Sequence, residues 1–99
     1  MAFSPAETTL AYAVAGVVND DTLSVDLSDG RSIAAPLSWY PRLAHATPAE
    51  RAKWRLIAGG DGIHWPDLDD DISVASLLAG KPSAESQQSL QRWLTGRRG

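Results

Sequence analysis

The most informative stretch of this sequence reads Gly59-Gly60-Asp61-Gly62-Ile63-His64-Trp65-Pro66-Asp67-Leu68-Asp69-Asp70-Asp71-Ile72-Ser73. It combines a glycine cluster, a His-Trp-Pro turn and five of the chain's twelve acidic residues within fifteen positions. Three interpretations are open for it: a metal site, a binding edge and a structural turn. The glycines favour a turn over a phosphate site, because Asp61 would repel phosphate and no lysine follows them.

A short helix and a hairpin are predicted immediately before and across these glycines. Thr47-Pro48-Ala49-Glu50 has the pattern of a capping box with proline at the first helical position, and it opens a helix that runs to about Arg55. Residues 56–58 and 63–65 can then pair as a short hairpin. The alternative is a helix that continues to Ile57.

Further towards the N-terminus the pattern changes to that of strands. Residues 10–19 are rich in valine and suit a strand, and the Asn-Asp-Asp sequence that begins at Asn19 favours a turn. Residues 23–27 alternate between apolar and polar, which indicates a half-buried strand. Asp29-Gly30 is a hairpin signal before a return strand over residues 31–36. These segments predict a three-stranded antiparallel meander, preceded by a flexible lead-in over residues 1–9.

Two helices are predicted after the acidic stretch. Ser73 is expected to cap a second helix, which Gly80 ends. Ser83 is expected to cap a third helix that runs to about Leu94 and is ended by Gly96, before a basic tail. The apolar stripe of this third helix either packs on the sheet or forms a dimer contact. The stripe consists of Leu90, Trp93 and Leu94.

The predicted fold class is therefore α+β: an antiparallel three-stranded meander plus a short hairpin, with two or three short helices. A chain of 99 residues forms one domain. Residues 10–80 make up its main part, and residues 81–99 add the C-terminal helix and basic tail to the same domain.

Composition and charge argue against several classes of protein. A formal net charge of −3 argues against free nucleic acid or an acidic membrane as the partner. The longest apolar run near the N-terminus, residues 10–18, is too short for a bilayer, which needs about 20 residues. The first basic residue is Arg31, so the start lacks the pattern of an export signal. The absence of cysteine fits a reducing cytoplasm, where we expect the protein to be.

Several motifs of this chain occur together in one known family. Over about residues 10–80 the sequence resembles a bacterial family of domains of unknown function, number 2442, most specifically in its His-Trp-Pro-x-Leu-Asp-x-Asp-Ile-Ser core. The motifs are Trp39-Tyr40-Pro41-Arg42-Leu43, Ala46-Thr47-Pro48 with Glu50-Arg51, Trp54, Gly62-Ile63-His64-Trp65-Pro66-Asp67-Leu68-Asp69, Asp71-Ile72-Ser73-Val74 and Leu77-Leu78.

The resemblance implies a small α+β domain and supplies no catalytic residue. Some members of the family carry a DNA-binding helix-turn-helix domain after this one. Others are encoded beside a small partner, in an arrangement similar to that of toxin and antitoxin. Only 21 residues follow Leu78 here, too few for a helix-turn-helix domain.

The acidic loop, residues 64–71, can be interpreted as a metal site or as a structural element. Imidazole and carboxylate can bind zinc, manganese or magnesium, but Trp65-Pro66 stiffens the backbone between the ligand types. We favour an acidic entrance to the Ser73 helix, where carboxylates interact with the helix dipole. We expect no metal and no cofactor. Catalytic residues are not expected either, since the chain lacks cysteine and a Gly-x-Ser-x-Gly elbow.

The function that we predict is a non-enzymatic protein-binding or regulatory module. It resembles an antitoxin that sequesters a small basic partner encoded beside it. The alternative is a ligand- or metal-binding domain that uses the loop from His64 to Asp71. Aromatic anchors hold complexes and rim charges steer association, so we expect Tyr40, Asp67 and Asp70 to be at least half exposed. The predicted partner-binding residues are Trp39, Tyr40, Arg42, His64, Trp65, Asp67, Asp69 and Asp70.

Overall fold

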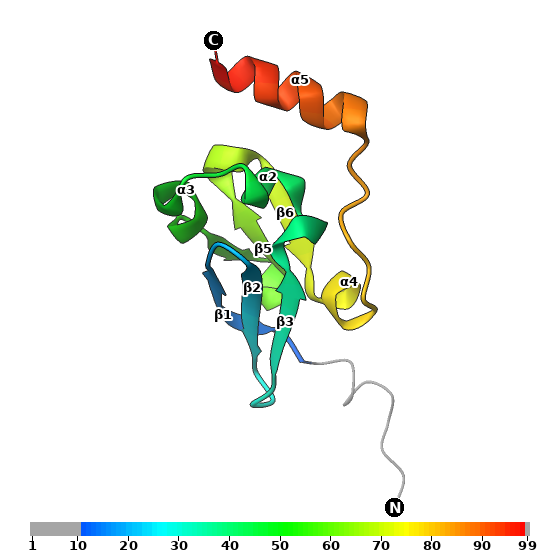
Figure 1. Ribbon diagram of the computed structural model, residues 1–99. Coiled ribbons are helices and arrows are strands. Elements are labelled where there is room, and N and C mark those ends of the chain that lie inside the picture. The colour runs from blue at the N-terminus through cyan, green and yellow to red at the C-terminus, as the bar shows by residue number, and fades with distance from the viewer. Residues whose placement is uncertain (1–10, 99) are drawn as a thin grey trace, which may run out of the picture.

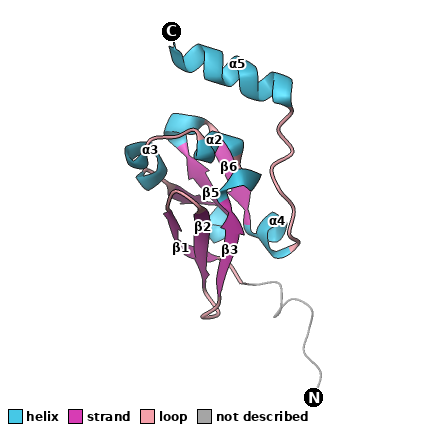
Figure 2. Cartoon of the chain, in the orientation of Figure 1, coloured by secondary structure: helices cyan, strands magenta, loops and turns pink. Residues whose placement is uncertain are grey.

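The computed structural model describes residues 11–98, and the predicted lead-in over residues 1–9 lies outside them. Within this range the chain forms two three-stranded antiparallel sheets with short helices between and after the strands (Figures 1 and 2). This confirms the α+β fold class. The strands are β1 (Ala13–Val18), β2 (Thr22–Leu27), β3 (Ser32–Pro36), β4 (Arg55–Ile57), β5 (Gly62–Trp65) and β6 (Asp70–Ser73). The α-helices are α2 (Pro41–Ala44), α3 (Pro48–Ala52), α4 (Val74–Leu78) and α5 (Gln87–Arg98), and the 3-10 turns are η1 (Leu37–Trp39), η2 (Ala58–Gly60) and η3 (Pro66–Leu68).

The first sheet is the predicted meander, with strand order β1-β2-β3. Its first turn is built by Asn19, whose side-chain oxygen accepts hydrogen bonds from the backbone N–H groups of Asp21 and Thr22, each at 2.8 Å. Its second turn contains Gly30 with a φ of 92°, a conformation that other residues adopt only with strain. Local turn chemistry therefore sets both connections of this sheet, as predicted.

The second sheet has the order β4-β5-β6 and is larger than predicted. The hairpin of β4 and β5 is confirmed, and helix α3 ends at Ala52, so the alternative of a helix to Ile57 is wrong. The third strand was not predicted: the acidic residues before Ser73 form β6, in which Ile72 pairs with Ile63. The acidic entrance to a helix is thus replaced by a strand, because pairing with β5 satisfies the backbone of this segment.

The two sheets bury one hydrophobic core between them. Leu23 and Val25 from β2 and Ile63 and Trp65 from β5 are all fully buried. Gly16 of β1 lies directly against Ile63, since a Cβ atom placed on it would be 3.4 Å from the Ile63 side chain. The first sheet therefore contacts the centre of the second one.

The helix caps near the core agree with the sequence. Thr47 accepts a hydrogen bond from the Glu50 N–H at 3.1 Å, and Glu50 accepts one from the Thr47 N–H at 2.9 Å, which is the predicted capping box. Ser73 accepts from the Ser76 N–H at 3.1 Å and caps α4, and Gly80 follows that helix with a φ of 70°. The segment between β3 and α3 contains η1 and α2, the latter with Pro41 at its first position.

Helix α5 differs from the prediction at both ends. Its first turn is capped by Ser86, which accepts from the Ser89 N–H at 3.1 Å, whereas Ser83 accepts from the Glu85 N–H at 3.2 Å within the preceding linker. The helix continues through Gly96 to Arg98, so Gly96 does not end it. Figure 1 shows α5 lying across one end of the domain, at the end of a linker that runs along the outside from α4.

Candidate functional site

Two of the four carboxylates of the acidic loop are paired with other side chains of the chain. Asp67 forms an ion pair with Lys53 at 3.4 Å, and the carboxylate of Asp71 contacts Nδ1 of His64. Asp69 is exposed and adopts a left-handed backbone conformation with a φ of 49°. Asp70 is only partly exposed, which corrects the expectation of an open side chain, because it alternates with Asp71 along β6 and points the other way.

Metal-binding residue types do not gather in this loop. Within residues 11–98, no group of three or more His, Cys, Asp and Glu side chains is placed to hold a metal ion. The same range contains no helix long and apolar enough to cross a membrane.

The aromatic residues of the predicted partner face belong mainly to the core. Tyr40 is only 3% exposed, so the expectation that it is at least half exposed is wrong. Trp65 is completely buried, and its indole N–H donates to the Arg51 backbone carbonyl at 3.1 Å. Trp39 is partly buried against the same core. In a domain this small, large aromatic side chains are needed to build the interior.

Arg42 connects three parts of the chain at the end of the domain. Its guanidinium binds the Glu85 carboxylate through Nε and Nη2 and donates from Nη1 to the backbone carbonyl of Leu68 at 2.9 Å. It also lies 5.1 Å from the ring centre of Trp93 on α5. The hydrogen bonds with Glu85 raise the pKa of Arg42 and lower the pKa of Glu85.

Because of these contacts, the surface around Arg42 is not open to a partner. The linker and α5 cover the surface around Arg42, and the apolar stripe of α5 packs inward, with Leu90 buried and Trp93 against the core. The predicted partner-binding residues therefore do not form one exposed face, and those that come together around Arg42 are covered. Its acidic members Asp67 and Asp69 remain accessible at the edge.

A different surface stays open: the outer face of the meander, on the side away from the core. The strand registers place two rows of side chains on it. Val17 on β1 is 64% exposed, and the β1 bulge residue Val14 is 47% exposed. Sequence reasoning missed these two valines, because an apolar strand residue is expected to be buried. The rows are Val17–Ser24–Ala34 and Ala15–Asp26–Ser32.

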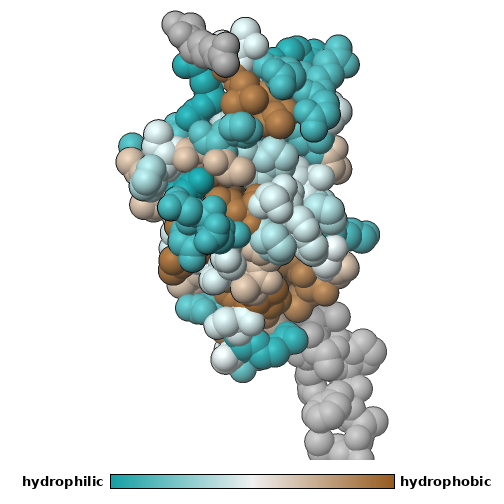
Figure 3. Space-filling view, viewed as in Figure 1, coloured by the Kyte–Doolittle hydropathy of each residue, from teal (hydrophilic) through white to brown (hydrophobic). Residues whose placement is uncertain are grey.

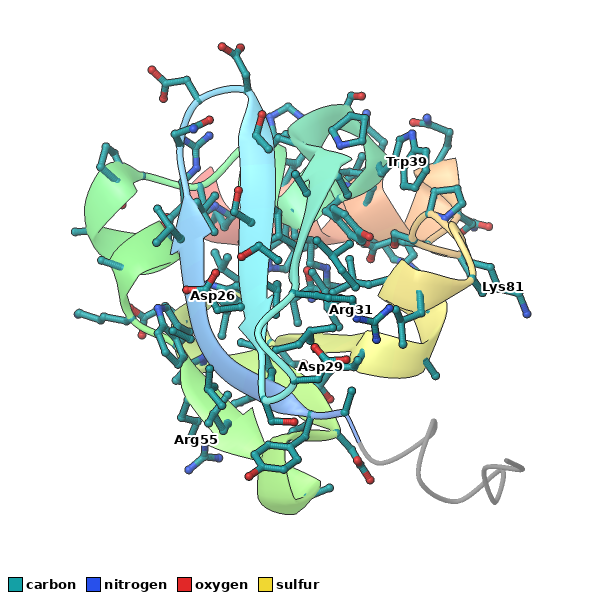
Figure 4. All side chains as sticks on the ribbon, turned by 90° about the horizontal axis from the view of Figure 1, so that it is seen from below. Asp26, Asp29, Arg31, Trp39, Arg55 and Lys81 are labelled. Atoms are coloured by element: carbon teal, nitrogen blue, oxygen red, sulfur yellow. The ribbon has the colours of Figure 1, made fainter. Side chains whose placement is uncertain are left out.

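The meander segment as a whole also carries the net charge of the protein. The segment Ala13–Pro36 holds four aspartates and one arginine, which accounts for the whole formal net charge of −3, and the remainder of the chain is balanced. Figure 4 shows Asp26 on the meander and Asp29 beside Arg31 at its hairpin turn. The four aspartates are Asp20, Asp21, Asp26 and Asp29.

A family comparison now agrees with the motifs of the sequence. A model of the family described as "Protein of unknown function (DUF2442)" matches residues 14–83. The chain belongs to the DUF2442 family. The match ends in the linker, so both sheets lie almost wholly within the DUF2442 region and α5 lies beyond it.

Two solved structures share the DUF2442 domain fold seen here. A crystal structure of a protein of unknown function from Rhodospirillum rubrum has a TM-score of 0.67 and 25% sequence identity, and the match covers 78% of this chain and 95% of that one. A solution NMR structure of an uncharacterized protein from Chromobacterium violaceum has a TM-score of 0.67 and 16% identity, covering 87% of this chain and 79% of that one. No curated protein matches this DUF2442 chain.

Proposed function

We propose that this protein is a non-enzymatic binding module for a small basic protein, which docks on the outer face of the meander. The observation that carries the proposal is the exposure of Val14 and Val17 on strand β1. Together with Tyr12, which is 44% exposed, they are three of the five large hydrophobic residues that are exposed in the described part of the chain. Val14 and Val17 lie three positions apart on one strand, and neighbouring exposed apolar residues mark an interaction site more often than isolated ones do.

The shape of this face suits a protein partner. Alanine and serine occupy most positions of the two outward rows, so the sheet surface is nearly flat around Val17. Small side chains allow the backbone of a partner to approach closely, and the valines then supply apolar contact. Figure 3 shows hydrophobic residues interspersed with hydrophilic ones on this side of the molecule.

Charge determines which kind of partner fits. The surplus of acidic residues lies on and around the meander, and Asp21 and Asp26 are exposed. An acidic surface attracts a basic protein over long range and speeds its association. This favours a partner with a basic, partly apolar docking segment.

In this role the protein resembles an antitoxin that sequesters a small toxin-like protein encoded beside it in the cytoplasm. Binding, and not catalysis, is the activity that we assign to it. The docking surface replaces the face around Tyr40 and Trp65, because those two side chains are buried.

The test is co-expression with the product of the adjacent gene, followed by binding kinetics at two salt concentrations. Val14→Ser with Val17→Ser should mainly speed dissociation, because it removes apolar contact. Asp21→Asn with Asp26→Asn should slow association and reduce its salt dependence. Asp67→Asn with Asp69→Asn is the matched control in the acidic loop and should bind like wild type. Loss of binding in the control alone would move the partner to the acidic loop, and no binding by wild type would refute the proposal.

A further inference from the structure

A cavity of about 370 Å³ lies beside strand β6 of the second sheet. Strand β6 and the start of α4 form one wall, and the linker after α4 forms the other. Figure 4 shows Lys81 of this linker extending outward from the domain. The residues whose chemistry matters in this cavity are Tyr40, Asp70, Ile72, Ser76, Lys81 and Pro82.

Tyr40 contributes a buried polar group that lacks a partner. The side chain lines the cavity but is only 3% exposed, and its hydroxyl has no hydrogen-bond partner among the residues that the structure describes. Buried hydroxyl groups in folded proteins are nearly always hydrogen-bonded, because an unpaired one is costly. The Tyr40 hydroxyl is therefore a buried polar group to which the described chain supplies no partner.

Asp70 contributes a carboxylate to the same cavity. It forms none of the ion pairs found within residues 11–98. Arg42 is the cation whose charge acts on it, but that guanidinium is already bound in a bidentate way to Glu85. Burial raises the pKa of Asp70 to about 6, against the opposing effect of Arg42. The carboxylate therefore lacks the solvation or the cation that an ionised carboxyl group needs.

We propose that this cavity binds a small organic cation through a primary ammonium group. An ammonium group has three donors and no acceptor, so it can donate to the Asp70 carboxylate and to the Tyr40 oxygen together. Ile72 and Pro82 offer apolar contact to an alkyl chain.

The residues that line the cavity also argue against anions and divalent metals as its ligands. An anion would be repelled by the Asp70 carboxylate in the cavity wall. A divalent metal would need more ligands than the described residues bring together. Lys81 is the one cation of the chain that lines this cavity within the described range, and its charge opposes the entry of a second cation without pairing with Asp70.

The experiment is a titration of the full chain followed by two-dimensional ¹H–¹⁵N NMR. The probes are n-butylammonium chloride, the neutral isostere 1-butanol and sodium butyrate. We expect saturable shifts at Ile72, Ser76 and Ala84 with butylammonium, and none with the other two probes. Equal binding of 1-butanol would show an apolar pocket only, and the absence of saturable shifts at millimolar butylammonium would also overturn the proposal.

Three variants and a control test the assigned contacts. Asp70→Asn should weaken butylammonium binding about tenfold or more, because it removes a charge-assisted hydrogen bond. Tyr40→Phe should weaken it several-fold, and Lys81→Ala should tighten it modestly by removing a nearby charge of the same sign. Asp67→Asn, in the same acidic loop but outside the cavity, should leave the affinity unchanged. If Asp70→Asn keeps the dispersed spectrum of wild type and binds the probe equally well, the proposal is wrong.

Discussion

Arg42 and Glu85 are joined by two parallel hydrogen bonds, from Nε to Oε1 at 2.9 Å and from Nη2 to Oε2 at 2.7 Å. The two side chains are only 17% and 11% exposed, so this ion pair is shielded from solvent far more than a surface pair. It fastens the linker before α5 to helix α2. Because Glu85 also accepts a hydrogen bond from Ser89 on α5, the pair positions the helix as well.

The first prediction concerns the ion pair of Arg42 and Glu85. Glu85→Ala should lower the free energy of unfolding by about 1.5–3 kcal/mol, because it leaves a partly buried guanidinium without its carboxylate. It should also increase backbone hydrogen exchange in α5 more than in either sheet. Thermal unfolding and hydrogen exchange measure the two effects.

The matched control is the exposed pair of Arg31 and Asp29, whose side chains are 56% and 40% exposed. Arg31→Ala should change the stability by less than about 1 kcal/mol. If Glu85→Ala has no larger effect than Arg31→Ala, and α5 exchanges as in wild type, then α5 is held by its apolar stripe alone.

The second prediction concerns the capping box of α3. Thr47→Ala should destabilise the protein by about 0.5–2 kcal/mol, because the Glu50 N–H loses its acceptor. Thr47→Ser keeps the hydroxyl and should retain most of the stability. Chemical denaturation measures both variants, and equal midpoints for Thr47→Ala and wild type would exclude a stabilising cap.

Local signals of this kind explain how much of the fold could be predicted. The Thr47 cap, the Asp29-Gly30 turn and the Ser73 cap each depend on a few neighbouring residues, and each appears in the structure where the sequence placed it. Strand β6 could not be predicted in this way. Its sequence Asp70-Asp71-Ile72-Ser73 has a single large apolar residue and two aspartates, which are rare in strands.

The candidate site was harder to predict for a related reason. Partners such as Arg42 and Glu85 are 43 positions apart in the sequence, and no local pattern brings them together. Burial is equally non-local: Tyr40 is covered by segments that follow it much later in the chain, so its exposure could not be judged from the adjacent Trp39 and Pro41. Residue chemistry was available from the sequence, but its spatial grouping was not.

The third prediction compares two adjacent glycines of η2. Both have positive φ angles, 67° at Gly59 and 97° at Gly60. A Cβ atom at Gly59 would meet nothing within 4 Å, whereas one at Gly60 would lie 2.8 Å from the Ala13 carbonyl oxygen and 2.9 Å from the Tyr12 Cβ. Gly59→Ala should therefore cost about 1–2 kcal/mol from backbone strain alone. Gly60→Ala should cost clearly more, because the start of β1 must move.

Thermal unfolding of the two variants under identical conditions is the measurement. Similar losses of stability in Gly59→Ala and Gly60→Ala would mean that η2 can withdraw from β1 at little cost. The close packing of η2 against β1 would then contribute little to holding the two sheets together.

The last prediction concerns the pH dependence of stability that Asp70 causes. Its pKa is raised from 3.8 to about 6 in the folded protein, first by burial and also by the charges of Glu85 and Asp71, while Arg42 opposes the shift. At a pH between these two pKa values, the folded state binds more protons at Asp70 than the unfolded state does. Stability due to Asp70 is therefore present below about pH 4 and is lost as the pH rises to about 6.

Asp70→Asn removes this titration and keeps the shape of the side chain. The variant should gain stability relative to wild type as the pH increases from 4 to 6, and the gain should stay constant above pH 7. Other groups contribute in the opposite direction: the Glu50 pKa is lowered to about 2 by its pairing with Arg97, so that pair is weakened only in strong acid, equally in both proteins. The difference between the two proteins thus isolates Asp70. Chemical denaturation at half-unit intervals of pH measures it, and a difference that does not change between pH 4 and 7 would show that the Asp70 carboxyl titrates alike in the folded and unfolded chain.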